Sequence, residues 1–217
     1  MPNLALRPFR DRDLDGLYAI SLATGHASGD ASALYADGRM MGHIYSAPYA
    51  KLCPDTCFVA EDEAGVAGFI VGAVDTRAFE ARLERDWWPD LRARYPDPGG
   101  TPPSTWTADQ RRCFMIHHPR RTPDAITAAF PAHLHMNLLP RRQGQGVGRS
   151  LLELWFAKAR ERGVTGVHVG TNANNHGALR FWRKCGFECL PSPASNGGTV
   201  WLGRHLDHGS KDQPNAT

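Results

Sequence analysis

The spacing of hydrophobic residues between His133 and Phe187 indicates secondary structure more clearly than in any other stretch of the chain. Alternating and adjacent apolar residues over 134–139 predict a short strand that ends at Pro140. After a glycine-rich stretch the spacing becomes helical over 149–162, and a second strand is predicted over 164–169. The apolar residues that carry these patterns are Leu134, Met136, Leu138, Leu139, Val147, Leu151, Leu154 and Trp155. The order is strand, glycine turn, helix, strand.

The rest of the chain predicts further strands and helices in alternation. Residues 4–9 read as a short strand followed by a helix, with Asp11 or Asp13 as its N-cap. Residues 58–61 and 66–74 read as a β-hairpin around a polar turn that contains glycine. Final strands follow a last helix. We therefore predict an α/β fold of the α+β type, with a single mixed, mostly antiparallel sheet flanked by helices.

The glycine-rich stretch is Gln143-Gly144-Gln145-Gly146-Val147-Gly148. Glycines let successive backbone N–H groups point into one concavity, and the first turn of the following helix adds unpaired N–H groups. This arrangement favours a phosphate or pyrophosphate. No Lys follows the glycines as a nucleotide-hydrolase loop requires, and the spacing is G-x-G-x-G, whereas dinucleotide folds use G-x-G-x-x-G.

A second motif runs from Asn175 to Phe187. Asn174 or Asn175 is a plausible helix cap, one face of the predicted helix is apolar, and Gly186 suits the left-handed position that ends a helix. The Q-x-x-G-x-G loop and the later N-x-x-A-x-x-[FL]-[YW]-x-x-x-G-F pattern occur in the order and separation that resemble the GNAT superfamily of CoA-dependent N-acetyltransferases.

The front half carries a closer resemblance. Tyr45-Ser46-Ala47-Pro48-Tyr49, the run 58–79, Trp88-Pro89-Asp90-Leu91, Arg94-Tyr95-Pro96 and Phe130-Pro131 are similar to the acetyltransferase-like C-terminal domain of eukaryotic O-GlcNAcase. In that domain the cofactor loop is thought to be degraded, whereas here it is intact. The resemblance implies a free-standing relative that binds acetyl-CoA as co-substrate. It does not imply glycosidase chemistry.

The same resemblance assigns the cofactor-binding positions. A backbone N–H near the end of the strand over 134–139 is the candidate donor to the thioester carbonyl. The side chain at position 182 is tryptophan where many members have tyrosine, and an indole cannot act as a general acid near neutral pH. The expected cofactor-binding residues are Leu138, Leu139, Gln143, Gly144, Gln145, Gly146, Val147, Gly148, Arg149, Asn175, Phe181 and Trp182.

Three residues are candidates for the base that removes the proton from an amine. His133 and His135 alternate along one strand and so share a face, and a neutral imidazole accepts protons near pH 7. They resemble the His-x-His of serotonin-acetylating members, but counting from the glycine loop places them one residue out of phase. A bulge would restore the register; without it they face the core. Asp75, at a strand end, is the third candidate and is equally suited to capping a helix.

Composition bounds the remaining possibilities. The 217 residues are 41% hydrophobic with a net charge of +3, and their mean hydropathy is −0.42. No apolar run approaches the ~20 residues of a membrane span, there is no signal-peptide pattern, and no basic stretch alternates with stacking aromatics. These features predict a cytoplasmic location without membrane or nucleic-acid partners. The five cysteines lack a convincing metal-ligand spacing, so we expect reduced thiols and no metal.

We expect one GNAT domain over 1–205 and a disordered tail over 206–217. Residues 78–132 form an insert with a helix over 80–95, a Pro/Gly linker over 96–103 and short helices over 106–126. The insert serves either as a wall on the acceptor side or as a homodimer contact. The predicted function is transfer of acetyl from acetyl-CoA to a primary amine, in a small molecule or peptide, by direct attack in a ternary complex. The alternative is a catalytically weak or inactive CoA-binding regulatory module.

Overall fold

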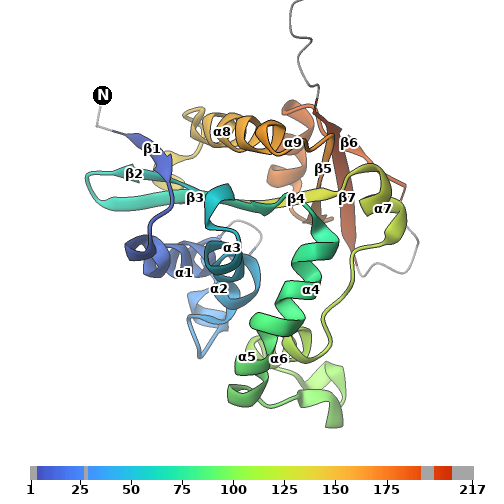
Figure 1. The fold of residues 1–217 in the computed structure, drawn as a ribbon. Coiled ribbons are helices and arrows are strands. Elements are labelled where there is room, and N and C mark those ends of the chain that lie inside the picture. The colour runs from blue at the N-terminus through green and yellow to red at the C-terminus, as the bar shows by residue number, and fades with distance from the viewer. Residues whose placement is uncertain (1–3, 27–28, 192–197, 207–217) are drawn as a thin grey trace, which may run out of the picture.

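The fold is built on one seven-stranded sheet (Figure 1). The structure is a computed structural model that describes residues 4–26, 29–191 and 198–206. The strands lie in the order β1-β2-β3-β4-β5-β7-β6. All neighbouring pairs are antiparallel except β4 and β5, which are parallel. The prediction of a mixed, mostly antiparallel sheet flanked by helices is confirmed.

The element bounds follow the hydrophobic pattern closely in both halves of the chain. The strands are β1 (Ala5–Pro8), β2 (Phe58–Asp62), β3 (Gly65–Ala73), β4 (Ala132–Leu138), β5 (Gly166–Asn172), β6 (Glu188–Cys189) and β7 (Thr199–His205). The helices are α1 (Leu14–Ala23), α2 (Met40–Tyr45), α3 (Ala47–Leu52), α4 (Thr76–Asp86), α5 (Trp88–Arg94), α6 (Ala108–His117), α7 (Asp124–Ala129), α8 (Val147–Glu161) and α9 (His176–Lys184).

The two faces of the sheet bury different cores. In Figure 1, α8 and α9 cover one face, and α1 to α6 lie against or beyond the other. The α8 side is filled by fully buried side chains such as Leu151, Trp155 and Phe156. The opposite face packs Val71 and other β3 residues against α1, α3 and α4. Because alternate residues of a strand face opposite sides, β4 contributes to both cores.

The insert differs from its prediction in one place. The helix expected over 80–95 is two helices, α4 and α5, which break at Trp87. Pro89 lies in the first turn of α5, where its missing N–H costs nothing, whereas continuing α4 through Pro89 would remove one of its hydrogen bonds. The insert shares a small core with α2, made of Met40 from α2 and Trp88, Leu91, Cys113 and Ile116 from the insert.

A partly buried polar network joins the insert to the front half of the chain. Tyr95 donates its hydroxyl proton to Asp37 (2.7 Å) and therefore accepts from Nε2 of His43 (3.2 Å). Nδ1 of His43 then accepts from the hydroxyl of Tyr18 (2.9 Å). Burial lowers the pKa of His43 to about 4, which keeps the ring neutral. The network fixes α5 against α1 and α2.

The last described residue of the chain belongs to the folded domain. Leu206, predicted to begin a tail, is 3% exposed and its N–H bonds to the Thr165 carbonyl (2.9 Å), so it belongs to the core; residues 207–217 lie outside the described part.

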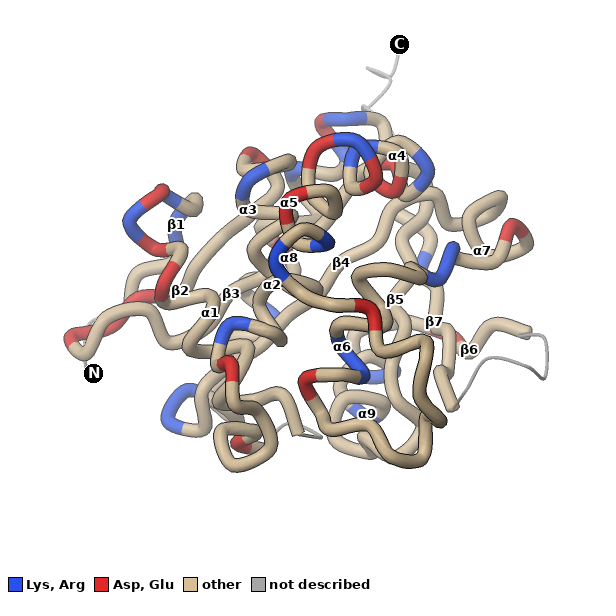
Figure 2. The backbone as a smooth tube through the Cα atoms, turned by 90° about the horizontal axis from the view of Figure 1, so that it is seen from below, with Lys and Arg blue, Asp and Glu red and all other residues tan. Residues whose placement is uncertain are grey.

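Acidic and basic positions are interspersed along the chain in Figure 2. No helix of the described residues is long and apolar enough to cross a membrane, and all five cysteines are free thiols.

Candidate active site

The glycine loop between β4 and α8 holds a row of unpaired backbone donors. Among the described residues, no hydrogen bond is formed by the backbone N–H groups of residues 144–149. Gly144 and Gly146 have φ of +71° and +80°, a conformation that other residues adopt only with strain, and a Cβ on either would point into open space. Six consecutive donors beside the N-terminus of a 15-residue helix form a cradle for an anion.

Side chains on both sides of the loop hold it in place. Gln143 donates through Nε2 to the Leu138 carbonyl (2.8 Å), and Gln145 donates to the Arg141 carbonyl (2.8 Å). Arg141 and Arg142 donate through Nε to Oδ2 of Asp62 in the β2–β3 hairpin, at 3.0 and 2.7 Å. These two guanidinium groups hold the pKa of the Asp62 carboxyl well below its usual range. Arg141 and Arg142 therefore anchor the loop.

The sheet opens next to this loop. β4 and β5 are paired only at Ala132↔Val167 and His133↔His168, and the strands separate beyond that point. Leu139 donates its N–H to the Ala67 carbonyl (2.8 Å), so the alternation of antiparallel bonding turns the N–H groups of Met136 and Leu138 away from β3 and toward the opening. The N–H of Leu138 is thus oriented toward the opening, whereas the N–H of Leu139 is bonded to β3.

The predicted cofactor-binding residues in and next to α9 differ in what they contact. Asn175 caps α9 by accepting from the Ala178 N–H (3.0 Å), as the sequence predicts. Phe181 lies against the loop: a Cβ on Gly148 would come within 3.2 Å of its ring, which explains the glycine there. Trp182 is 6% exposed and packs edge-on against Phe187 (5.2 Å between centroids), so most of its ring belongs to the core under α9. Arg149 is exposed at the start of α8.

His133 and His135 lie on the face of β4 opposite to α8. The β3–β4 register is regular from His133 to Leu138, so no bulge shifts them. They are paired with Ala73 and Val71, whose side chains pack against α1, α3 and α4. The two rings are 6.4 Å apart between centroids. No bulge therefore moves these two residues to the other face of β4, and the face on which they lie contains a cavity.

The cavity has a volume of about 570 Å³ and lies between β4 and the insert. His135 is on its sheet side, and the α6–α7 loop contributes the exposed Arg120 and Arg121. Its apolar walls are Ile44, Tyr45, Tyr49, Leu83, Trp88 and Met115. Helices α4 to α6 therefore form a cavity wall, which supports the first of the two roles considered for the insert.

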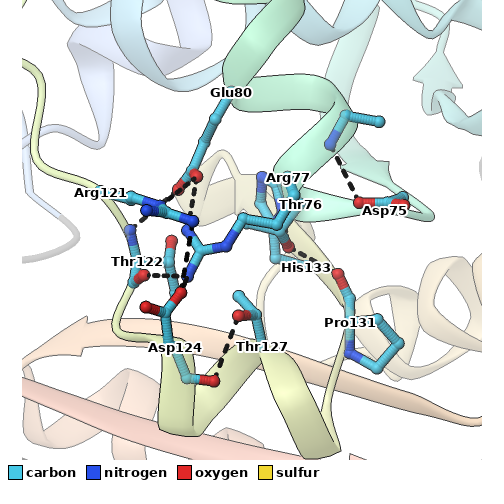
Figure 3. A network of polar contacts seen from close by, with 11 residues as sticks. Asp75, Thr76, Arg77, Glu80, Arg121, Thr122, Asp124, Thr127, Pro131 and His133 are labelled. Carbon is cyan, nitrogen blue, oxygen red and sulfur yellow. Dashed lines mark hydrogen bonds and ion pairs between the residues drawn. The ribbon is translucent and has the colours of Figure 1, made fainter.

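Burial keeps the histidines of this region neutral. It lowers the pKa of His135 to about 4, and it lowers the pKa of His133 well below its usual value, with the nearby His168 adding to both shifts. His133 is bonded at both nitrogens, to Tyr49 (2.8 Å) and Thr76 (2.8 Å), and Figure 3 shows the Thr76 side. His135 forms no hydrogen bond within the described residues and is contacted by the rings of Tyr45 and Tyr49.

Asp75 has a structural role in this geometry. Its carboxylate accepts from the Ala78 N–H (3.0 Å) and caps α4, as Figure 3 shows. It does not line the cavity that contains His135 but a second one of about 450 Å³, next to Asp124 and Thr127. The two cavities share Arg77 and Arg121. Among the described residues, no group of three or more His, Cys, Asp or Glu side chains is placed to hold a metal ion.

Sequence reasoning did not identify Tyr49, Thr76 or His168 as parts of this site. Tyr49 belongs to one of the short motifs that are similar to O-GlcNAcase, but its hydrogen bond with His133 joins residues 84 positions apart. His168 stacks on His133 (5.6 Å) across the short parallel pairing and donates through Nδ1 to the Phe130 carbonyl (2.7 Å). No local pattern could indicate contacts of this range.

The sheet opens beside a helix N-terminus, with a glycine cradle on one side and a cavity lined by His135 on the other, an arrangement that suits an acyltransferase. Residues 32–187 match the acetyltransferase (GNAT) family, and the chain belongs to that family. It is an acetyltransferase.

Individual relatives agree with this assignment. The crystal structure of SsHAT superposes with a TM-score of 0.87 and 35% identity, covering 95% of this chain and 100% of that one. Mycothiol acetyltransferase of Thermomonospora curvata is 31% identical over 117 residues, which are 52% of this chain and 38% of that protein. Protein O-GlcNAcase of Rattus norvegicus is 23% identical over 204 residues. That match spans 93% of this chain but 22% of the length of O-GlcNAcase, so the expected resemblance is confirmed for one region of that protein.

Proposed function

We propose that this enzyme transfers an acetyl group from acetyl-CoA to a primary amine by direct attack in a ternary complex. The observation that carries the proposal is the arrangement around β4. Six free N–H donors lie at its end, two more face the opening toward β5, and an unbonded histidine faces a cavity on the other side. Both substrates can therefore approach the same strand from different sides.

The backbone N–H groups of the glycine loop are suited to bind the cofactor. Backbone N–H groups at a helix N-terminus suit the pyrophosphate of CoA, and exposed basic residues close by, such as Arg149 and Lys184, suit a further phosphate. When bound, acetyl-CoA supplies the acetyl group as an activated thioester. The N–H groups of Met136 and Leu138 would hold the thioester carbonyl oxygen and the neighbouring amide part of the cofactor.

His135 is the base in this proposal. In the transfer the amine nitrogen forms a bond to the acetyl carbon, the carbon–sulfur bond breaks, and the nitrogen loses a proton. The ring of His135 is neutral and lies at the sheet side of the cavity, so it can take that proton directly or through a water molecule. The sulfur needs a proton in return. Trp182 cannot supply it, so we assign that step to water.

The alternative, a CoA-binding module without turnover, shares the glycine loop and is favoured by Trp182 in place of tyrosine. It is separated from the enzyme by acceptor-dependent release of free CoA thiol across a panel of amines. The loop is tested by a matched pair of substitutions, Gly146→Asp and Gly163→Asp. Both glycines have positive φ (+80° and +73°) and open space around the Cβ position, so both variants carry the same backbone strain.

Only Gly146 lies in the proposed pyrophosphate cradle. We expect acetyl-CoA to raise the melting temperature of the unsubstituted protein and of Gly163→Asp, and to lose that effect in Gly146→Asp. An equal shift in both variants would remove the cofactor assignment. A shift without thiol release from any amine would favour the binding module.

A further inference from the structure

The acceptor cavity is apolar in its body and charged on the insert side. Aromatic and aliphatic side chains, among them Tyr45, Trp88 and Met115, line its walls. His135 lies on the sheet at one side, and the exposed Arg120 lies on the α6–α7 loop at the other. A molecule that places its amine next to His135 can therefore extend along the apolar walls to the loop, because both residues line the same cavity.

Both carboxylates of the cavity lining are already neutralised by arginines. Glu84 is held by two bonds from Arg92, at 2.8 and 3.1 Å. Glu80 accepts from Arg77 (2.6 Å) and from the Thr122 N–H (2.8 Å), and Figure 3 shows this arrangement. Each carboxylate is thus already paired with an arginine, which makes it a weaker partner for a second ammonium group of a substrate.

Among the described residues, two arginines in or next to the cavity lining have no acidic partner: Arg120, which lines the cavity, and Arg112, which lies behind the lining residue Tyr45. In the described part of the chain, no carboxylate lies within 4.0 Å of Arg120 or Arg112. Arg112 donates instead to the hydroxyls of Tyr35 (2.9 Å) and Tyr45 (3.2 Å), and Tyr45 lines the cavity. Since the acids of the lining are paired and these two cations are not, the cavity carries a surplus of positive charge.

We propose that the acceptor is an amine with an apolar body and a carboxylate at its far end, which Arg120 binds while the amine lies next to His135. This proposal rests on the proposed function and adds the class of acceptor. A guanidinium binds a carboxylate with two parallel hydrogen bonds, and the apolar walls remove the substrate body from water. Acceptors with a second cation meet repulsion at the same place.

Three benzylamines that differ only in the para group test this directly. They are 4-(aminomethyl)benzoate, 4-methylbenzylamine and p-xylylenediamine, which carry an anion, a methyl group and a second cation. Rates of CoA thiol release are divided by the fraction of free amine for each compound. We expect kcat/KM to be about fivefold or more higher for the carboxylate than for the methyl compound, and lowest for the diamine.

A matched pair of variants locates the effect. Arg120→Gln should reduce the preference for the carboxylate compound over the methyl compound toward one. Arg111→Gln, an exposed position on α6 outside the cavity lining, should retain that preference. Raising the salt concentration should weaken the preference, because exposed charges are screened. Equal rates for the three amines, or a preference that survives Arg120→Gln, would overturn the proposal.

A binding measurement separates this proposal from the proposed function. The three amines are titrated calorimetrically into the full chain saturated with CoA. Tighter binding of the carboxylate compound, lost in Arg120→Gln, supports the acceptor class even where no turnover is found, and then only the catalytic proposal fails. Turnover of the methyl compound with no preferential binding of the carboxylate overturns the acceptor class and leaves the catalytic proposal in place.

Discussion

The phenolic oxygen of Tyr49 lies 2.8 Å from Nε2 of His133, and the direction of that hydrogen bond is fixed by the other side of the ring. Thr76 donates its hydroxyl proton to the Pro131 carbonyl (2.7 Å), so it must accept from Nδ1 of His133 (2.8 Å). Nε2 then carries a lone pair and accepts from Tyr49. His133 has no free nitrogen for a substrate, which leaves His135 as the histidine open to the cavity.

Tyr49→Phe tests this arrangement. The substitution keeps the ring, which stacks on Phe79 (4.3 Å), but leaves a buried imidazole nitrogen without its donor. We expect the free energy of unfolding to fall by about 1–3 kcal/mol. The affinity for acetyl-CoA should not change, because Tyr49 lies on the other side of the sheet from α8. Denaturant unfolding and calorimetric titration measure the two quantities. Unchanged stability would mean that the bond does not form.

His135→Ala is expected to reduce turnover by about 100-fold or more, the usual contribution of a positioned base, with little effect on acetyl-CoA affinity. Burial lowers the pKa of His135 to about 4, so its own titration does not set the pH dependence of the rate near neutral pH. His135 is already neutral above about pH 5, so the rise of the rate through neutral pH reflects deprotonation of the amine. The rate per free amine should be flat between about pH 6 and 9 and should fall only near pH 4. Turnover that is indifferent to His135 would contradict this assignment.

The sequence predicts local features of this site better than distant ones. The cofactor loop depends on consecutive residues whose glycines meet local needs: φ at Gly144 and Gly146, and close approach of Phe181 at Gly148. Their spacing is therefore visible in the chain. The split between α4 and α5 was also local, because Pro89 marks it, but helical periodicity on both sides of Trp87 concealed the break.

The acceptor side depends on tertiary packing. Pairing with β3 decides on which side of the sheet His133 and His135 lie. That side contains a cavity only because the insert packs there. Trp182 shows the same limit. Its motif position suggested contact with the cofactor, but packing against Phe187 decides its environment. A tyrosine there would leave part of that space empty, so we expect Trp182→Tyr to lower the stability.

Asp62→Asn tests the anchor of the glycine loop. The side chain of Asp62 is 4% exposed and bonds both Arg141 and Arg142, and the side chain of Arg142 is 10% exposed. Without the carboxylate, Arg142 keeps a buried charge with no acidic partner, and the loop loses its tie to the β2–β3 hairpin. We expect acetyl-CoA to bind about three- to tenfold more weakly by calorimetry.

The matched control is Asp55→Asn, which removes the ion pair with Arg162 near the far end of α8. Both of those side chains are about half exposed, so the pair contributes little, and cofactor affinity should be retained. Equal weakening in the two variants would show that the effect is general loss of stability and that Asp62 does not position the loop.

Stability should fall as the pH drops from about 6.5 toward 4, because four histidines are buried in the neutral form. Burial lowers the pKa of His43 and His135 to about 4, and those of His133 and His168 are also lowered. In the unfolded chain histidine titrates near pH 6.5. Below that pH the unfolded state binds more protons than the folded state, so the free energy of unfolding decreases with decreasing pH.

The position of this fall on the pH axis distinguishes histidines from carboxylates. Asp13 and Asp62 also have lowered pKa values, but the stability they contribute is lost only below about pH 4, where unfolded aspartate titrates. Urea unfolding between pH 8 and 5 therefore reports the histidines. We expect little change between pH 8 and about 7 and a decrease from about pH 6.5 to 5, with a shallower decrease in His135→Ala, which has one buried imidazole fewer. A flat profile down to pH 5 would contradict the burial of these rings as neutral groups.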